Sequence, residues 1–165
     1  MEATDLARKT AEFASHDINK VEIPAGSNAG PQIMPYLLYT GLPAGQPYCA
    51  SACSYWVHLA AGSMDVTPIF KKSGSALGLV KNNPSLFVAP DDFDVSMVPC
   101  IGINEHSDHV HGHAFLIVGF DEATGKFQTI DPNSNAEGGR EGTGVWLLTI
   151  RSVHDTNRKG YIRIA

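Results

Sequence analysis

The segment VHGHAFLIVGFDEATGKFQTID (110–131) indicates the fold class of this chain. Two apolar runs within it, Val110–Phe120 and Lys126–Asp131, are rich in the β-branched and aromatic residues that favour strands. The five residues DEATG (121–125) between the runs contain the Asp and Gly that are typical of a hairpin turn. We therefore predict two antiparallel strands that are joined by a tight turn.

Outside this hairpin, three further runs have the character of strands: Val95–Ile103, Val145–Ile150 and Tyr161–Ile164. The N-terminal part of the chain predicts helices instead. Helices that come first and strands that come later, without strict alternation, are typical of an α+β protein with an antiparallel sheet. We expect the N-terminal helices to pack on a twisted antiparallel sheet of about five strands.

The apolar spacing predicts three helices. The first covers residues 3–17, where apolar side chains recur at helical intervals. The second covers residues 31–38, begins with a proline and is ended by Gly41. The third covers residues 48–61, with Gly62 as its C-terminal cap.

The length of 165 residues, with 43% hydrophobic and 18% charged residues, suits one domain that spans residues 1–165. The net charge is −5 and no basic face is visible, which argues against a nucleic-acid partner. No apolar run approaches the roughly 18 residues of a membrane span, so we expect no membrane insertion. The start MEATDLARKT lacks the pattern of a Sec-type signal peptide, which predicts synthesis in the cytoplasm without such a signal.

Cys49 is the first candidate for chemistry. It follows Gly45-Gln46-Pro47-Tyr48 and lies in the first turn of the third predicted helix. Unpaired N–H groups and the helix dipole stabilise a negative charge there, and the thiolate is the nucleophilic form of cysteine. Its backbone N–H is also placed to bind a developing oxyanion. From position alone, a buried structural cysteine is an equal alternative.

His113 and the turn Asp131-Pro132-Asn133 extend this candidate site. His113 begins the first strand of the hairpin, and the turn ends the second, so antiparallel pairing brings the two close together. His113 would take the thiol proton and return a proton to a leaving amine. Asp131 or Asn133 would accept from the second ring nitrogen and fix its tautomer. A surface or core histidine and a plain Asp-Pro-Asn turn are the alternatives.

Together, Cys49, His113 and Asp131/Asn133 make a thiol triad of the papain-like kind, and here the sequence resembles a family. GQPYCASACSYW (45–56) resembles the nucleophile motif of the CHAP (cysteine, histidine-dependent) amidohydrolases/peptidases. GHAFLIVGFD (112–121) resembles their histidine strand, and FQTIDPNSNAEGGREGTGVW (127–146) their acid–Gly–Asn stretch. EIPAGSNAGPQIMPYL (22–37) is similar to the segment before the cysteine in one branch. The resemblance implies a papain-like (CHAP) fold.

The resemblance also assigns roles residue by residue. It implies Cys49 as nucleophile, His113 as general base, and Asp131 at a position where the family usually has Glu. Asn133 matches the family's Asn, so the choice between Asp131 and Asn133 as the residue that orients His113 stays open. Gln46 and Tyr48 would face the substrate or oxyanion, Tyr48 in place of the usual Trp. Further departures are Phe115 for a small residue and Pro132 for Gly.

The function implied by the resemblance is hydrolysis of a peptide or amide bond of bacterial peptidoglycan, by an amidase or an endopeptidase. A small acidic enzyme without a signal peptide fits an interbacterial toxin delivered by type VI secretion and held in check by an immunity protein, or a phage endolysin. The net negative charge favours the toxin slightly. Either would act in the periplasm or on the cell wall after export or lysis.

A histidine cluster offers a rival interpretation. His106, His109, His111 and His113 lie within eight residues, with Asp108 among them. On a strand, His109, His111 and His113 would point to one face, and three histidines are a known catalytic zinc set. No HExxH-type motif accompanies them, and the surrounding residues have loop character. A metal-dependent hydrolase is therefore the weaker alternative, and we predict no metal and no other cofactor.

A third interpretation is a binding module that keeps the fold without the chemistry. The residue types at all three triad positions are competent for catalysis, which argues against this interpretation. Among the remaining features, we expect Cys53 and Cys100 to pack rather than pair, because free cysteine is among the most buried residue types. Trp56 and Trp146 lie in apolar runs and are predicted core anchors. Asn28 and Gly30 are expected to shape a turn.

Overall fold

Helices fill the first half of the chain and strands the second half in the computed structural model, which describes residues 3–135 and 142–165. Within those residues the α-helices are α1 (Asp5–His16), α2 (Met34–Thr40), α3 (Cys49–Met64) and α4 (Ala76–Asn82). The strands are β1 (Phe87–Val88), β2 (Cys100–Glu105), β3 (Gly112–Asp121), β4 (Lys126–Ser134), β5 (Gly144–Leu148) and β6 (Arg158–Ile162). Two short 3₁₀ helices, Pro90–Asp92 and Val95–Met97, lie between β1 and β2.

The strands of the described residues form one six-stranded sheet in the order β1-β6-β2-β3-β4-β5, with every neighbouring pair antiparallel. The central β3–β4 pair is the hairpin predicted from residues 110–131. Its turn is held by Asp121, whose carboxylate accepts hydrogen bonds from the N–H of Ala123 and the hydroxyl of Thr124. The predicted α+β class is confirmed, with one strand more than the expected five.

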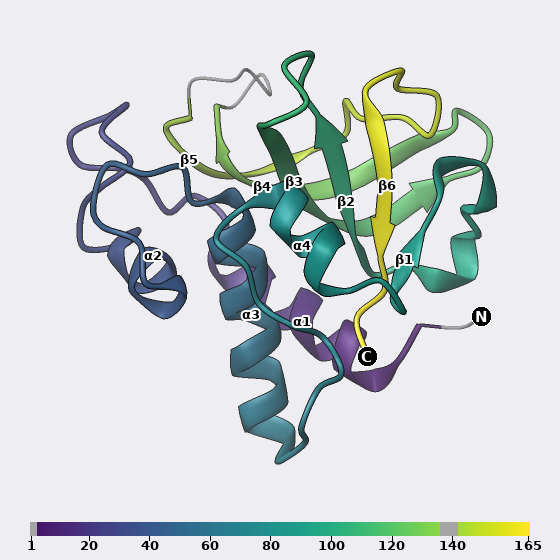
Figure 1. The fold of residues 1–165 in the computed structure, drawn as a ribbon, viewed down its shortest axis with the longest axis horizontal. Helices are drawn as coiled ribbons and strands as arrows, with labels where there is room; N and C mark the ends of the chain where they lie inside the picture. Colours follow the sequence, from purple (N-terminus) through teal and green to yellow (C-terminus); the bar gives the residue numbers. More distant parts are fainter. Residues whose placement is uncertain (1–2, 136–141) are drawn as a thin grey trace.

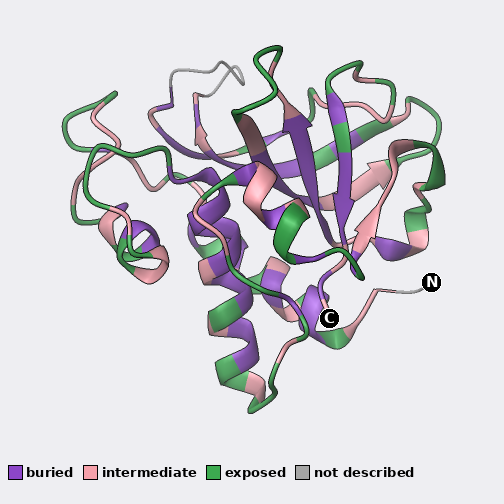
Figure 2. Cartoon of the chain, in the orientation of Figure 1, coloured by how far each residue is buried: buried purple, intermediate pink, exposed green. Residues whose placement is uncertain are grey.

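Helices cover one face of this sheet (Figure 1). The long helix α3 packs against α1 and α2 on its outer sides and against β3 and β4 on its inner side. Trp56 of α3 is fully buried and joins Leu116 of β3 and Ile130 of β4 in the main hydrophobic core. Figure 2 shows that buried residues run along α3 and the central strands. Trp56 is thus a core anchor, whereas Trp146 is only partly buried and donates to the carbonyl of Ser134.

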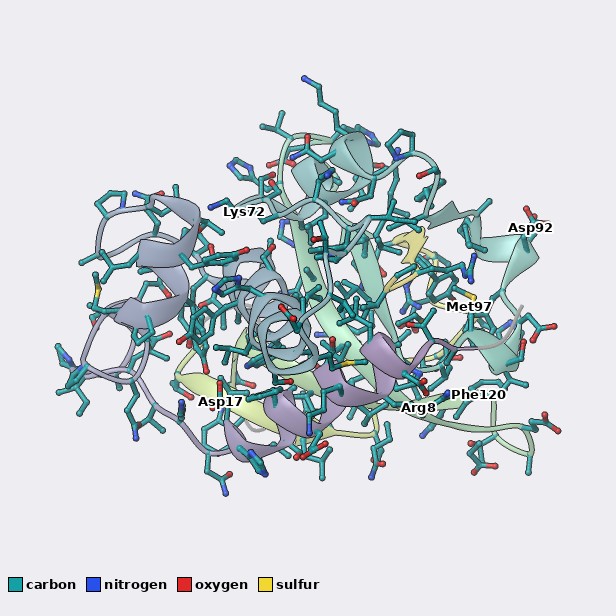
Figure 3. All side chains as sticks on the ribbon, turned by 90° about the horizontal axis from the view of Figure 1, so that it is seen from below. Arg8, Asp17, Lys72, Asp92, Met97 and Phe120 are labelled. Atoms are coloured by element: carbon teal, nitrogen blue, oxygen red, sulfur yellow. The ribbon has the colours of Figure 1, made fainter. Side chains whose placement is uncertain are left out.

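A smaller core lies on the opposite face of the sheet, because side chains alternate along a strand. Phe115 and Ile117 of β3 point there and pack with Phe127 and Tyr161, under a cover that includes Met97. Met97 and Phe120 lie at one end of the molecule, away from Asp17 at the helical end (Figure 3). Both faces of the central hairpin are therefore buried, which fixes the register of β3 and β4.

Two predicted helix boundaries were wrong. The second helix begins at Met34 rather than at residue 31, because residues 31–33 form turns that are closed by bonds to the carbonyl of Gly30. It ends as predicted at Gly41, which has a φ of 76°. The third helix passes through Gly62 and ends at Met64, since Asp65 itself takes the left-handed conformation that caps the helix.

The predicted strand Val95–Ile103 was wrong in its first half. Asp94 accepts a hydrogen bond from the N–H of Ser96 and starts the 3₁₀ helix at Val95–Met97. Pro99 has no N–H to give to a ladder, and the strand β2 begins directly after it. The short elements α4 and β1 were not predicted, because seven and two residues are too few to show a clear period.

The cysteines and the 21–30 loop agree with the sequence-based expectations. Cys49, Cys53 and Cys100 are all free. Cys53 and Cys100 belong to the two different cores, so they pack rather than pair. Asn28 (φ 50°) and Gly30 (φ 109°) both adopt left-handed conformations that turn the loop before α2.

A buried carboxylate ties the helical layer together. Asp17, just after α1, accepts hydrogen bonds from the hydroxyl of Tyr36 (2.6 Å) and from the indole N–H of Trp56 (2.7 Å). Lys20 supplies the compensating charge at 2.6 Å. Asp17 thus ties the end of α1 to the first turn of α2 and to the middle of α3, through the fully buried donors Tyr36 and Trp56.

We expect Asp17→Ala to lower the free energy of unfolding by about 3 kcal/mol, because the buried donors of Tyr36 and Trp56 both lose their acceptor. Urea titration followed by circular dichroism measures this loss. Glu12→Ala is the control, since Glu12 forms an exposed ion pair with Lys9 that is worth less than about 1 kcal/mol. Equal losses in the two variants would contradict a central role for Asp17.

Candidate active site

Cys49 is the first residue of α3 and lies against the strand that carries His113. The first-turn N–H groups of a helix have no partner within the helix, and the dipole favours negative charge at this end. The backbone N–H groups of Ala50 and Ala114 and the ring of His113 lie near the sulfur of Cys49 and favour its ionised form. Cys49 is therefore held at the junction of the main helix and the central hairpin.

The ring of His113 lies between Cys49 and Asp131. Its Nε2 is 2.9 Å from Oδ1 of Asp131, which leaves Nδ1 to face the thiol of Cys49. His113 is in β3 and Asp131 in β4, so the hairpin itself brings them together. The side chain of His113 is 16% exposed and that of Asp131 is fully buried. The structure thus brings Cys49, His113 and Asp131 into one continuous chain of contacts.

Asp131 has two more partners, neither of which the sequence indicated. Arg151 places Nε 3.0 Å and Nη2 2.9 Å from Oδ1, and Thr129 donates its hydroxyl to Oδ2 at 2.7 Å. The guanidinium also lies 4.5 Å from the centroid of Phe115, whose ring stacks on His113. The carboxylate is consequently fixed on both oxygens, and its charge is balanced from two sides.

The electrostatics favour a thiolate paired with an imidazolium. Burial opposes ionisation of Cys49, but the hydrogen bond and charge of His113, with the N–H groups of the neighbouring backbone, outweigh it, so the pKa of Cys49 is lowered. Burial likewise opposes protonation of His113, yet Asp131 and Cys49 raise the pKa of His113 to about 9. Against burial, His113 and Arg151 lower the pKa of Asp131. The lowered thiol pKa and the raised imidazole pKa describe a nucleophile that is ready to react.

A cavity of about 800 Å³ opens over Cys49 and His113. The exposed side chain of Gln46 lines it beside Cys49, as expected for a residue that contacts a substrate or an oxyanion. Asn133 and Arg151 line it on the side of the sheet. The rest of the wall comes from the segment 73–76, from residues within 104–113, and from Thr40, Leu42, Pro47 and Asn157. The site is therefore open to a ligand of the size of a short peptide.

Tyr48 was wrongly expected to face a substrate. Its side chain is fully buried, stacks on Tyr36 and donates its hydroxyl to Glu22 at 3.1 Å. Burial first, and then the negative charge of Glu22, raise the pKa of Tyr48. The residue before the nucleophile therefore supports the helix start from inside the core.

The open choice between Asp131 and Asn133 is resolved geometrically by the contact of Asp131 with His113. Asn133 lies two residues farther along β4, has a φ of 54°, and lines the cavity. Its backbone lies near the hydroxyl of Tyr48, where it opposes the rise in the pKa of Tyr48. Asn133 is thus placed to contact a bound molecule, while Asp131 is placed to orient the imidazole.

The histidine cluster does not form the metal face that a strand would have made. The strand β3 begins only at Gly112, and residues 107–110 form a turn. His109 lies 3.4 Å from Glu105, while His111 binds Asp108 at 2.7 Å. Among residues 3–135 and 142–165, no group of three or more His, Cys, Asp or Glu side chains is placed to hold a metal ion. His106 and His111 instead line the cavity.

Sequence reasoning missed Arg151 and Thr129. Arg151 follows an apolar strand as an isolated basic residue, and such residues are normally solvated, so nothing in the sequence singles it out. Thr129 lies two residues before Asp131 on the same strand, and this spacing puts both side chains on one face. That spacing was the one signal in the sequence that could have indicated Thr129.

Comparisons with known proteins returned no match: no protein-family model matches the chain, and neither do the curated proteins or the solved structures that were searched. In the described part of the chain, no helix is both long and apolar enough to cross a membrane. The motif at 127–146 includes residues 136–141, which lie outside the described residues.

We expect iodoacetamide to alkylate Cys49 at pH 6 at least about ten times faster than it alkylates free cysteine, whose usual pKa of about 8.5 leaves little thiolate at that pH. The advantage should disappear above about pH 9, where the free thiol is ionised too and His113 loses its proton. Mass spectrometry of the Cys49 peptide measures the rate.

His113→Ala should bring the rate at Cys49 down to that of free cysteine, because the group that lowers the thiol pKa is removed. Cys53 and Cys100 act as internal controls in the same digest, since burial raises the pKa of both. If wild-type Cys49 reacts no faster than free cysteine, its thiol is not activated.

Proposed function

We propose that this chain is a cysteine hydrolase that cleaves an amide bond by acyl transfer, with a papain-like catalytic arrangement of the CHAP type. One observation carries the proposal: the thiol of Cys49, the imidazole of His113 and the buried carboxylate of Asp131 follow one another in space, and Cys49 and His113 line a cavity of about 800 Å³. A nucleophile beside a base, with the base oriented by a third group, is the arrangement that nucleophilic catalysis requires.

In the proposed reaction, the sulfur of Cys49 attacks the carbonyl carbon of the bound amide and forms a carbon–sulfur bond. His113 gives its proton to the nitrogen as the carbon–nitrogen bond breaks, and the amine leaves. Water then adds to the thioester while His113 takes one of its protons, and the carbon–sulfur bond breaks to release the carboxylic acid and to restore the thiolate of Cys49 beside protonated His113. Asp131 keeps the imidazole oriented throughout.

The negative oxygen of each tetrahedral intermediate needs hydrogen-bond donors. The N–H of Cys49 stands at the helix start, where backbone donors point out of the helix. The side-chain amide of Gln46 lines the cavity beside it and supplies a second donor in this proposal. Two such donors are typical of an oxyanion hole, where loss of one costs roughly a hundredfold or more in rate.

Bacterial peptidoglycan is the substrate that we propose, on the basis of the resemblance of residues 45–56, 112–121 and 127–146 to the CHAP motifs. The lining of the cavity supports a peptide that carries carboxylates. It includes the amide side chains of Gln46, Asn104, Asn133 and Asn157 and, among the described residues, no Asp or Glu, although the chain as a whole has a net charge of −5. Amidase and endopeptidase activity are both compatible with this lining.

The biological setting of this activity is also part of the proposal. An interbacterial toxin of the type VI kind, restrained by an immunity protein, and a phage endolysin would both use this chemistry. The net charge of −5 favours the toxin, because a lytic enzyme gains from attraction to anionic walls. Both settings put the activity in the periplasm or on the cell wall.

Digestion of purified sacculi tests the proposal. We expect wild-type protein to release products that Cys49→Ala does not, because the variant has no nucleophile. Mass spectrometry identifies the bond: loss of whole stem peptides from the glycan indicates an amidase, and shortened or uncrosslinked stems indicate an endopeptidase. The absence of any Cys49-dependent product from either Gram type of wall would remove peptidoglycan from the proposal.

The same digestion with EDTA separates the thiol mechanism from the histidine–metal alternative. We expect chelation to leave the rate unchanged, since His109 is engaged with Glu105 and His111 with Asp108 rather than with each other. A rate that falls with EDTA and returns with zinc would support the metal mechanism instead. Normal Cys49 alkylation without any turnover would support the binding-module alternative.

Asp131→Ala should slow turnover by about 100-fold or more, because His113 loses both its orientation and its charge partner. Asn133→Ala should slow it far less, by about tenfold or below, since Asn133 lines the cavity without touching the imidazole. Turnover of both variants on the same sacculi measures the difference. Unchanged far-UV circular dichroism in each variant is the control for folding, and the reverse order of severity would contradict the assignment of Asp131.

A further inference from the structure

Arg151 stands at the far end of the chain of contacts that begins at Cys49. Its Nε and Nη2 both bind Oδ1 of Asp131, at 3.0 and 2.9 Å, and its side chain is only 13% exposed. Its backbone is fixed as well, because its carbonyl accepts a hydrogen bond from the N–H of Phe127 at 2.9 Å. The geometry is that of a rigid, charge-assisted contact rather than a surface ion pair.

Four charges alternate along this line when the thiol is ionised: negative Cys49, positive His113, negative Asp131 and positive Arg151. Their sum is zero. Without Arg151 the buried group would carry one net negative charge, and an unbalanced buried charge is strongly unfavourable. A neutral amide in place of Asp131 would need no such partner.

We propose that Arg151 is a positioning residue that keeps the buried Cys49–His113–Asp131 group electrically neutral, so that Asp131 stays ionised and Cys49 forms a thiolate at a lower pH than it otherwise would. This inference rests on the proposed thiol mechanism, but not on the identity of the substrate. Arg151 acts through Asp131 and His113, and the reaction needs no contact between Arg151 and the reacting atoms.

The other titratable groups near this array do not supply the same charge. They are Tyr48, Cys53, His106, His111, Asp155 and Arg158. Burial raises the pKa of both Tyr48 and Cys53, so they stay neutral. His111 is paired with Asp108. Arg158 lies 5.0 Å from the Phe115 ring, but its guanidinium is paired with Asp155 and Asn104.

The sign of the effect follows from electrostatics. Removal of a positive charge makes protonation easier for every group nearby, so Arg151→Met should raise the pKa of Cys49 and of Asp131. Asp131→Asn removes a negative charge and should act in the opposite direction. The double variant restores neutrality, and its behaviour should return toward that of the wild type.

The experiment is a pH profile of Cys49 alkylation by iodoacetamide, read on the Cys49 peptide by mass spectrometry. The acid limb of the profile is the pH range in which the rate rises as Cys49 ionises. We expect this limb to shift to higher pH by about one unit in Arg151→Met, which corresponds to an about tenfold lower rate at a given pH on the limb. Asp131→Asn should move it down, and the double variant should fall within about 0.3 units of the wild type. Arg151→Lys keeps the charge and should move the limb by less than half as much as Arg151→Met.

Arg163→Met is the matched control, because it changes the net charge of the chain equally but lies in the C-terminal segment after β6. Its profile should coincide with that of the wild type. A purely structural role for Arg151 would lower the melting temperature without moving the acid limb. Circular dichroism and thermal melting of each variant therefore accompany the profiles.

Several results would overturn the inference. These are an Arg151→Met profile that coincides with the wild type, shifts of the same sign in the two single variants, and a double variant that shows no recovery. If Arg151→Met does not fold, the double variant decides: a folded protein with a near-wild-type profile supports the inference, and an unfolded one refutes it. Failure of the mechanism itself looks different, because wild-type Cys49 would then react as slowly as free cysteine.

Discussion

The buried carboxylate of Asp131 is the constraint on which the candidate site depends. A carboxylate without access to water costs several kcal/mol unless positive and hydrogen-bonding groups replace the lost solvent. His113, Arg151 and Thr129 supply those groups from β3, from the segment after β5, and from β4 itself. The strands β3 and β4 and the segment after β5 are thus fixed to one another at this carboxylate. The imidazole that faces Cys49 is fixed with them.

The aromatic ring of Phe115 supports two of the side chains that bind Asp131. His113 stacks on it, and the guanidinium of Arg151 lies over it. The ring fits because Gly102 stands opposite in the register of β2 and β3, and any Cβ at that position would overlap the ring. The large ring at position 115 is therefore matched by a glycine on the next strand and by a cation above it.

The sequence predicted what depends on local pattern and missed what depends on packing. The hairpin, the α+β order and the positions of Cys49, His113 and Asp131 follow from periodicity, turn residues and strand pairing. The helix α3 is capped by Asp65 rather than by the predicted Gly62, because the local sequence is compatible with a helix end at either residue. Tyr48 was misplaced because the direction of a side chain beside a helix start depends on the core beneath it. Arg151 was invisible, since its partner is 20 residues away in the chain.

Tyr48 shows how the helix start and the sheet are held at the correct separation. Its ring is locked in the core against Tyr36, and its hydroxyl donates to Glu22. The backbone of Asn133 lies near the same hydroxyl, and Asn133 belongs to the strand that carries Asp131, so the residue before Cys49 packs beside that strand. A thiol and an imidazole react well only when their separation is fixed to within about an ångström. Tyr48 therefore supports the proposed chemistry from inside the core, where its side chain is fully buried.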